Sequence, residues 1–432
     1  MIIKKTNSYH KFLPIASLLL FMFPAAQISG PFLTDLFLIL ISIIFLYIYK
    51  QDEEFILSRT LFFRLFVIFY IYIVIGSFFS ENLILSLRSS GAYFRFGVFS
   101  LAVFFILKND KNFLKYFYIV LLITLAVLMF DGYFQFITGK NIFGYVTNRP
   151  ERLSGLFFDE LILGSYLSKL LPIFCTFIFL NKENFGKKYI FIFVILIYIL
   201  IFLSGERAAF LVSSLYLIMI LPFLFNFKKI IILFISIIAI LVSLLSFNTV
   251  LKDRMVDQFL KHTIYKCTDD INYTCDDKIY IMPDHYGIFV AAIDIFKKNI
   301  LFGSGVKTFR IHCKDSDPIK MKRLNETIHN FKYCSSHPHN YYLQLLSETG
   351  IIGFLFIVSI LFKLFFNYFK QFYYLITKKE KVNKSYICIL AGLIVMIWPL
   401  TTTGSFFNNW ICSTLFLTIG IYLFLSSNES KI

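Results

Sequence analysis

Charged residues and tryptophan are scarce in this chain. Only 16% of its 432 residues are charged and two are tryptophan, whereas 58% are apolar and 56 are phenylalanine. Soluble proteins carry roughly 45–50% apolar residues, so the composition argues against a soluble globular chain. The mean hydropathy is +0.73, and apolar runs recur along almost the whole length. We therefore expect an integral membrane protein with many spans rather than a soluble domain with one anchor.

Several common sequence signals are also missing. No CxxC or HExxH spacing points to zinc, and the glycine-rich stretch 303–310 lacks the GK[ST] ending of a Walker loop. No small-residue cleavage site follows the first apolar run, so we expect that run to remain as a span. The net charge is +16. Because most lysines lie in short loops between apolar runs, this charge indicates membrane orientation rather than nucleic-acid binding.

Twelve apolar runs approach the length of about 20 residues that a helix needs to cross a bilayer. They lie at 12–28, 32–49, 61–79, 89–107, 114–131, 160–180, 188–204, 208–225, 229–247, 342–362, 386–401 and 407–426. The predicted fold class is an all-α polytopic membrane protein with about twelve transmembrane helices. Residues 1–247 hold spans 1–9, and residues 248–338 form a large external helical lid between spans 9 and 10. Residues 339–432 hold spans 10–12, with a candidate catalytic motif at the start.

Lysines are distributed unevenly between alternate loops. One set of loops is rich in them, including 108–115 and the six lysines between Lys363 and Lys384, whereas the opposite short loops hold few. The positive-inside rule then puts both termini in the cytoplasm and the segment 248–338 outside. This segment is too long for a passive connector. Its apolar pattern predicts a helix over 286–296.

Four of the seven cysteines lie in the external segment, and the other three, Cys175, Cys388 and Cys412, fall inside spans. The four are Cys267, Cys275, Cys313 and Cys334. An even number in an oxidising compartment suggests two disulfides. We favour Cys267–Cys275 and Cys313–Cys334, because each closes a local loop. A zinc site is the alternative, since His312 neighbours Cys313.

Arg207 lies in a short turn between two apolar spans. An arginine at membrane depth usually faces a cavity or an anion, and its planar fork suits phosphate. A salt bridge to Glu206, or a role as an interface anchor, would explain it equally well. Arg149 and Arg152 form another external basic turn, for which the simpler explanation is a solvated loop that caps the next helix.

Two histidines flank Pro338 where the external segment rejoins the membrane. A neutral histidine near pH 7 can take a proton from a hydroxyl nucleophile, which makes His339 a candidate base. Without further support, the simpler explanation is a histidine that caps the start of the span. The glycine-rich, basic stretch 303–310 is by itself most simply a turn that ends the lid helix.

Four stretches together carry a family resemblance: RLSGLFFD at 152–159, SGERAAFL at 204–211, FGSGVKTFR at 302–310 and HPHNYYLQLLSETGIIG at 337–353. They resemble motifs of the O-antigen ligase and polymerase family of bacterial membrane enzymes. The resemblance implies that His339 is the catalytic base, with Asn340 beside it in the substrate site. It also implies that Arg207 binds the diphosphate of a lipid-linked sugar donor.

One departure from the family pattern concerns the lid helix. Where similar proteins commonly carry a second arginine, this chain has His285, which is charged only partly near neutral pH. Either Arg310, Arg152 or Arg149 supplies the second cation, or donor binding is weaker and pH-sensitive.

The resemblance implies an inverting, metal-independent glycosyltransferase of lipopolysaccharide biosynthesis that uses no cofactor. It would lie in a bacterial inner membrane with its active site facing the periplasm. The donor would be a polyprenyl-diphosphate-linked glycan and the acceptor a sugar hydroxyl of lipid A-core; the other expected partners are membrane lipids, and no nucleic acid. A polymerase of the same family and a transporter of lipid-linked oligosaccharides are the alternatives.

Overall fold

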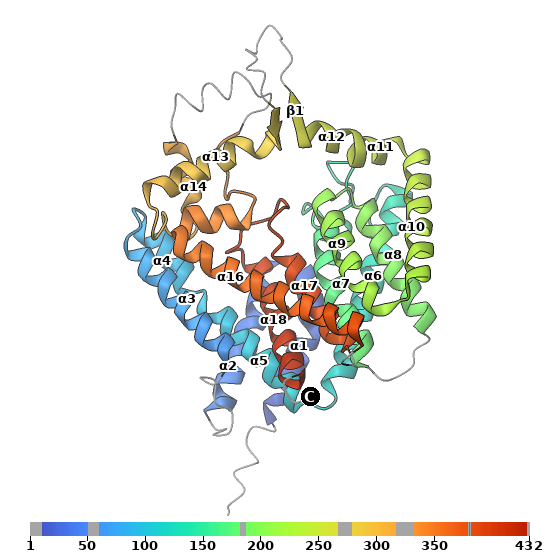
Figure 1. The fold of residues 1–432 in the computed structure, drawn as a ribbon, viewed down its shortest axis with the longest axis horizontal. Helices are drawn as coiled ribbons and strands as arrows, with labels where there is room; N and C mark the ends of the chain where they lie inside the picture. The colour runs from blue at the N-terminus through green and yellow to red at the C-terminus, as the bar shows by residue number, and fades with distance from the viewer. Residues whose placement is uncertain are drawn as a thin grey trace, which may run out of the picture.

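The computed structural model describes residues 11–50, 60–181, 187–266, 279–316, 332–378, 380 and 382–429. Helices dominate these residues (Figure 1). The first six are α1 (Leu13–Ile28), α2 (Pro31–Tyr49), α3 (Leu61–Phe78), α4 (Leu83–Gly91), α5 (Phe94–Asn109) and α6 (Phe113–Thr138). After the short 3-10 helix η3 (Gly155–Phe157) come α7 (Leu163–Leu180), α8 (Lys187–Leu203), α9 (Arg207–Leu224) and α10 (Phe227–Phe247). The chain ends in α16 (Tyr341–Thr377), α17 (Lys384–Met396) and α18 (Asn409–Glu429).

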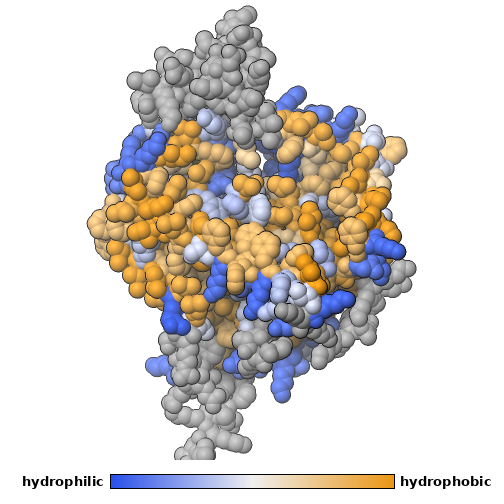
Figure 2. Space-filling model, in the orientation of Figure 1, coloured by the Kyte–Doolittle hydropathy of each residue, from blue (hydrophilic) through white to orange (hydrophobic). Residues whose placement is uncertain are grey.

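The packing is that of a membrane protein. In the interior, α5 packs against α18, and α17 packs against α7 and α9. No residue of α10 is buried, and its isoleucines, such as Ile232 and Ile235, face outward. Figure 2 shows hydrophobic residues across the middle of the molecule and hydrophilic ones toward its two ends. Such a broad apolar surface is stable in a bilayer and not in water.

The predicted fold class, an all-helical polytopic membrane protein, is confirmed. Within the described residues, nine helices are long and apolar enough to cross a membrane, and three shorter apolar helices accompany them. One of the nine runs from Leu83 to Asn109 and combines α4 with α5, so the predicted span 89–107 contains the turn between these helices. The exact number of crossings, twelve, stays a prediction.

Helix α16 differs from the predicted span 342–362. Gly350 interrupts it with the non-helical angles φ 66° and ψ −170°, so that residues 341–349 and 351–377 form two helical pieces joined at a kink. The second piece continues to Thr377, beyond the predicted end of the span at 362. Lys363 and Lys370 therefore lie on this helix and not in a loop.

The segment between α10 and α16 lies at one end of the molecule, opposite the C-terminus (Figure 1). It contains α11 (Thr249–Lys252), the π-helix η4 (Asp253–Asp257), α12 (Gln258–Thr263), α13 (Pro283–Lys298), α14 (Phe309–His312) and the 3-10 helix η5 (Cys313–Asp315). The predicted helix over 286–296 is confirmed by α13. A hairpin of β1 (Ile264–Lys266) and β2 (Ile279–Ile281) was not predicted, because three-residue strands are too short to give a periodic signal.

Candidate functional site

A polar cavity of about 1090 Å³ lies beneath the lid helix α13, between the start of α9 and the irregular segment that leads into α16. Five of the seven predicted site residues line it: Arg149, Arg152, Arg207, His285 and His339. Two basic residues that sequence reasoning missed, Arg254 and Lys332, line it as well. Arg310 and Asn340 are not among the lining residues. The cavity therefore combines one candidate base with a surplus of positive charge.

His339 is held in place by its backbone. Its φ angle is 55°, in the left-handed region, and its carbonyl accepts a hydrogen bond of 2.8 Å from the N–H of Thr403. The adjacent Asn340 caps α16, since its side-chain oxygen accepts from the N–H groups of Tyr342 and Leu343. The Asn340 amide also donates to the carbonyl of Pro399 at 2.8 Å. Asn340 is thus placed to support His339 through the backbone.

The His339 ring is neutral at physiological pH. Burial, together with the nearby His337 and His285, lowers its pKa to about 4, although a hydrogen bond to the backbone of Thr403 opposes this shift. The ring centroids of His285 and His337 lie 5.0 Å and 4.2 Å from that of His339. A neutral imidazole has a nitrogen lone pair that can accept a proton.

His337 has different surroundings from its neighbour. Its Nδ1 lies 2.9 Å from the Ser336 hydroxyl, and it is not a lining residue of the cavity. Among the described residues, its buried Nε2 has no hydrogen-bond partner. Burial lowers the pKa of His337 also. The cavity thus distinguishes the two histidines, and His339 is the one that faces it.

Arg207 is the first residue of α9 and does not pair with Glu206. The Glu206 carboxylate lies 3.7 Å from the guanidinium of Arg152. Glu206 also accepts hydrogen bonds from the backbone N–H groups of Gly164 and Ser165, at 2.7 Å and 3.2 Å, and so caps the start of α7. The alternative of a Glu206–Arg207 salt bridge is therefore wrong, and the carboxylate that attracts the charge of Arg207 is Asp284, on the lid helix.

The turn before Arg207 requires a glycine. Gly205 has φ +71°, and a Cβ added there would lie 2.4 Å from the carbonyl oxygen of Glu151. The backbone of the 149–152 turn thus lies against the turn that presents Arg207. The N–H of Leu153 also donates to the carbonyl of Ser204 at 3.2 Å. These contacts bring the RLSGLFFD and SGERAAFL motifs together.

Arg254 comes to the cavity from η4, far from the other motifs in sequence. Its Nε donates to the carbonyl of Gly205 at 3.1 Å, and its Nη1 donates to Gln258 at 2.9 Å. Burial, together with the charges of Arg207 and Arg152, lowers its pKa to about 10, so the group is still charged at neutral pH. One signal could have identified it: an arginine just after a span on the lysine-poor side departs from the positive-inside rule.

The FGSGVKTFR motif contacts the first piece of α16, which follows His339, through backbone hydrogen bonds. The N–H groups of Ser304 and Gly305 donate to the carbonyls of Ser347 and Glu348 at 2.9 Å and 3.0 Å. A Cβ on Gly303 would lie 2.5 Å from the backbone of Glu348, so only glycine permits this crossing. The motif is therefore a backbone support for α16, consistent with a turn after the lid helix. Arg310, which follows it, interacts electrostatically with His337.

The Glu348 carboxylate joins the same segments. It accepts hydrogen bonds from the N–H groups of Lys307 and Phe309, at 2.9 Å and 3.2 Å, and from the Gln344 side chain at 2.9 Å. The Gln344 side-chain oxygen accepts from the N–H of Phe406 at 2.7 Å. The piece 341–349, which follows His339 directly, is thus fixed on two sides.

A disulfide joins Cys313 to Cys334, the pairing expected from the sequence. Cys334 lines the cavity, so the disulfide links the irregular segment that leads into His339 to the lid. The other expected pair, Cys267 and Cys275, lies outside the described residues. Cys175, Cys388 and Cys412 are buried free thiols. The part of the chain that the structure describes contains no group of three or more His, Cys, Asp or Glu that could hold a metal ion.

Many apolar helices, a lid at one end and a basic cavity beneath it define a polytopic membrane protein with a positively charged cavity under its lid. Residues 191–358 match the family model described as O-antigen ligase, which confirms the resemblance seen in the sequence. The match supports a membrane glycosyltransferase of the O-antigen ligase or polymerase type. It includes Arg207, Arg254, His285 and His339. No curated protein matches the chain.

Proposed function

We propose that this protein transfers a glycan from a polyprenyl-diphosphate donor to a sugar hydroxyl of lipid A-core, with inversion at the transferred sugar. The observation that carries the proposal is one cavity that holds both the neutral His339 and the positive charges of Arg149, Arg152, Arg207, Arg254 and Lys332. Such charge suits a diphosphate, and such a histidine suits a hydroxyl nucleophile. The lysine-poor side on which the lid lies supports a periplasmic active site.

Arg254 can supply the second cation that the lid helix lacks, where this chain has His285 instead of an arginine. It lies on the Arg207 turn through its bond to Gly205, and its fork can bind phosphate oxygens bidentately. Arg152, in contrast, pairs with the Glu206 carboxylate and donates to the carbonyl of Leu161 at 2.6 Å, whereas among the described residues Arg254 donates only to the uncharged Gly205 carbonyl and Gln258 amide. We assign Arg254 as the second cation of the donor site, with Arg149 and Lys332 at its edge.

The proposed step is a direct displacement. The acceptor hydroxyl gives its proton to His339 as its oxygen forms a bond to the anomeric carbon of the donor sugar. The bond from that carbon to the diphosphate breaks, and the lipid-linked diphosphate leaves with the electron pair. Arginine stabilises the charge that builds on the leaving group, without a metal ion in this scheme. One displacement inverts the anomeric centre.

A pKa of about 4 makes the His339 imidazole neutral but weakly basic. A bound diphosphate brings negative charge close to the ring, and negative charge favours the imidazolium form. The donor therefore raises the pKa of His339 toward the working pH, where a general base is most effective. Donor binding and base strength are coupled in this scheme.

The test is transfer by purified protein in detergent, with a defined lipid-linked donor and a defined lipid A-core acceptor. We expect a covalently extended acceptor without any ion gradient. Failure to join the two, with donor moved across a vesicle membrane instead, would assign the protein to the transporters. A product in which one donor glycan extends another, with the acceptor core untouched, would make it a polymerase of the same family.

A further inference from the structure

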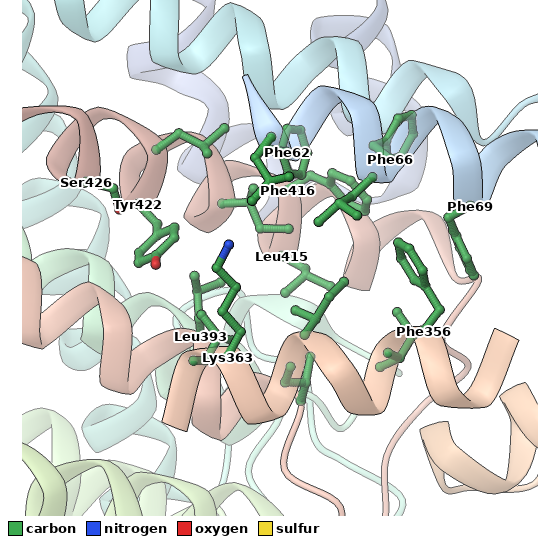
Figure 3. Close-up of a pocket in the computed structure, with 18 of the residues that line it drawn as sticks. Phe62, Phe66, Phe69, Phe356, Lys363, Leu393, Leu415, Phe416, Tyr422 and Ser426 are labelled. Atoms are coloured by element: carbon green, nitrogen blue, oxygen red, sulfur yellow. The ribbon is translucent and has the colours of Figure 1, made fainter. Parts of the chain in front are cut away.

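A second cavity of about 440 Å³ lies among α3, α16, α17 and α18, away from the basic cavity. Its walls are apolar, and most of its aromatic residues are shown in Figure 3, including Phe66, Phe69, Phe356 and Phe416. The volume falls in the range of roughly 300–1,000 Å³ that small-molecule sites occupy. The walls can hold a hydrocarbon chain but offer little to a polar ligand.

One end of this cavity is polar. Figure 3 shows the Lys363 side chain extending from α16 toward the end that Tyr422 and Ser426 line. The Tyr422 hydroxyl accepts a hydrogen bond from the Asn367 amide at 3.1 Å. Among the described residues, Lys363 makes no ion pair, and the buried Ser426 hydroxyl has no hydrogen-bond partner. A lysine that faces an apolar cavity without a carboxylate points to an anionic ligand.

The polar end lies at the membrane face opposite the basic cavity. Helix α3 begins beside Lys363, where Thr60 and Leu61 line the cavity. The other end of α3 leads to Ser80, whose hydroxyl donates to the carbonyl of Ser304 behind the basic cavity at 2.6 Å. The polar end of this cavity and the basic cavity therefore lie at opposite leaflets of a membrane.

We propose that this cavity binds one acyl chain of an anionic phospholipid from the leaflet opposite the active site, with its phosphate on Lys363. The exposed Lys363 head can reach the phosphate layer while its stem lines the apolar wall. The apolar interior of the cavity then holds the acyl chain. The donor lipid, in contrast, carries its diphosphate at the other face, so it cannot place that group on Lys363 at the same time.

The bound chain would also support the active-site helix. Phe356 and Phe406 line the cavity, and the N–H of Phe406 donates to Gln344 in the piece 341–349. Phe356 stacks on Phe69 with ring centroids 5.0 Å apart. The lipid therefore fills space next to residues that hold the helix following His339.

Native mass spectrometry of the full-length protein tests this proposal with phosphatidylglycerol and phosphatidylcholine, each with two 16-carbon chains. We expect one tightly bound phosphatidylglycerol, about fivefold tighter than phosphatidylcholine, the factor that one lysine near an anionic lipid supplies. Lys363→Ala should remove this preference. Lys370→Ala is the matched control, because Lys370 is exposed on the same helix, does not line the cavity and lies over the Tyr374 ring.

A second variant and a labelled lipid test the cavity itself. Leu393→Trp should fill the space and weaken both lipids, and phosphatidylglycerol with a photoreactive chain should label peptides of α16 and α18. Equal binding of the two lipids to the unaltered protein, or an unchanged preference in Lys363→Ala, would overturn the proposal. Displacement of phosphatidylglycerol by a polyprenyl phosphate, with label lost from α16, would assign the cavity to the donor chain instead.

Discussion

His339 adopts a left-handed backbone conformation that is unfavourable for a residue other than glycine. A left-handed φ in a residue other than glycine costs about 1–3 kcal/mol and persists only where the surroundings impose it. Here the loop between α17 and α18 holds it in place, since the N–H of Thr403 donates to the His339 carbonyl and the carbonyl of Pro399 accepts from the adjacent Asn340 side chain. The result is a ring fixed against the basic cavity.

Replacing His339 tests its role as base. We expect His339→Ala to lower the transfer rate by about 10²–10⁴-fold, the usual effect of losing a general base. Donor binding should change little, because arginine holds the diphosphate. His339→Asn should behave the same way and is the better-folded control, since asparagine tolerates a left-handed φ. His337→Ala should lose much less; near-normal transfer by both His339 variants would refute the assignment.

The pH dependence of transfer follows from the pKa of His339. The active form is neutral, so kcat/KM for the donor should rise with pH through about 4 and stay level through neutrality. At saturating donor the acid limb of kcat should lie at higher pH, because the bound diphosphate stabilises the imidazolium. Rates of the purified protein measured across this range give both limbs. Coincident limbs would show that the donor does not lie near His339.

Arg254 is the residue whose role the sequence did not reveal. We expect Arg254→Ala to raise the KM for the donor about tenfold, in line with the loss of one charge-assisted hydrogen-bonded contact to an anion. Arg254→Lys should recover only part of it, since lysine keeps the charge but not the fork. Lys252→Ala, two residues away and exposed, is the control. An unchanged donor KM in Arg254→Ala would leave the second cation to Arg149 or Lys332.

At the scale of elements, the kink in α16 joins the lid to the membrane helices. The N–H of Ile351 donates to the carbonyl of Ile300 at 2.8 Å, which draws the end of the lid helix against the kink. The Tyr72 hydroxyl on α3 donates to the carbonyls of Leu301 and Thr349 at the same place. The helix that follows His339 is thereby packed against both the lid and the bundle.

Gly350→Ala should break this junction. An added Cβ would lie 2.2 Å from the Leu301 carbonyl oxygen, and the angles of Gly350 belong to a region that side chains rarely adopt. We expect a thermal unfolding midpoint lowered by several degrees in detergent, with transfer reduced as well. Gly91→Ala is the matched control, because it lies in a helix and a Cβ there meets nothing within 4 Å. Equal midpoints for the two variants would contradict this account.

At the scale of the whole molecule, the orientation rests on lysine asymmetry. Reporter fusions after Lys188 and after Lys384 should report a cytoplasmic position, and fusions near Lys278 should report the external side. A cytoplasmic reading near Lys278 would place the basic cavity on the wrong side for a lipid-linked donor outside the cell. It would overturn the proposed function and reverse the leaflet assigned to the phospholipid.

The sequence by itself determined the class of protein, and it indicated the family resemblance and the candidate site residues. Apolar run length decides which segments enter a membrane, and this property is local to each segment. Short motifs such as the HN pair at His339 are likewise local, and so is the apolar pattern that predicted α13. These features can be identified from the sequence without knowing which segments meet.

Tertiary structure alone decided which charged side chains pair with each other and which of them line the basic cavity. The pairing of Glu206 with Arg152, and the arrival of Arg254 at the Gly205 carbonyl, depend on contacts between segments far apart in the chain. The kink at Gly350 depends on the backbone of 300–301 crossing α16. No local pattern encodes such crossings, because each one is fixed by the packing of two segments whose separate sequences are compatible with other partners.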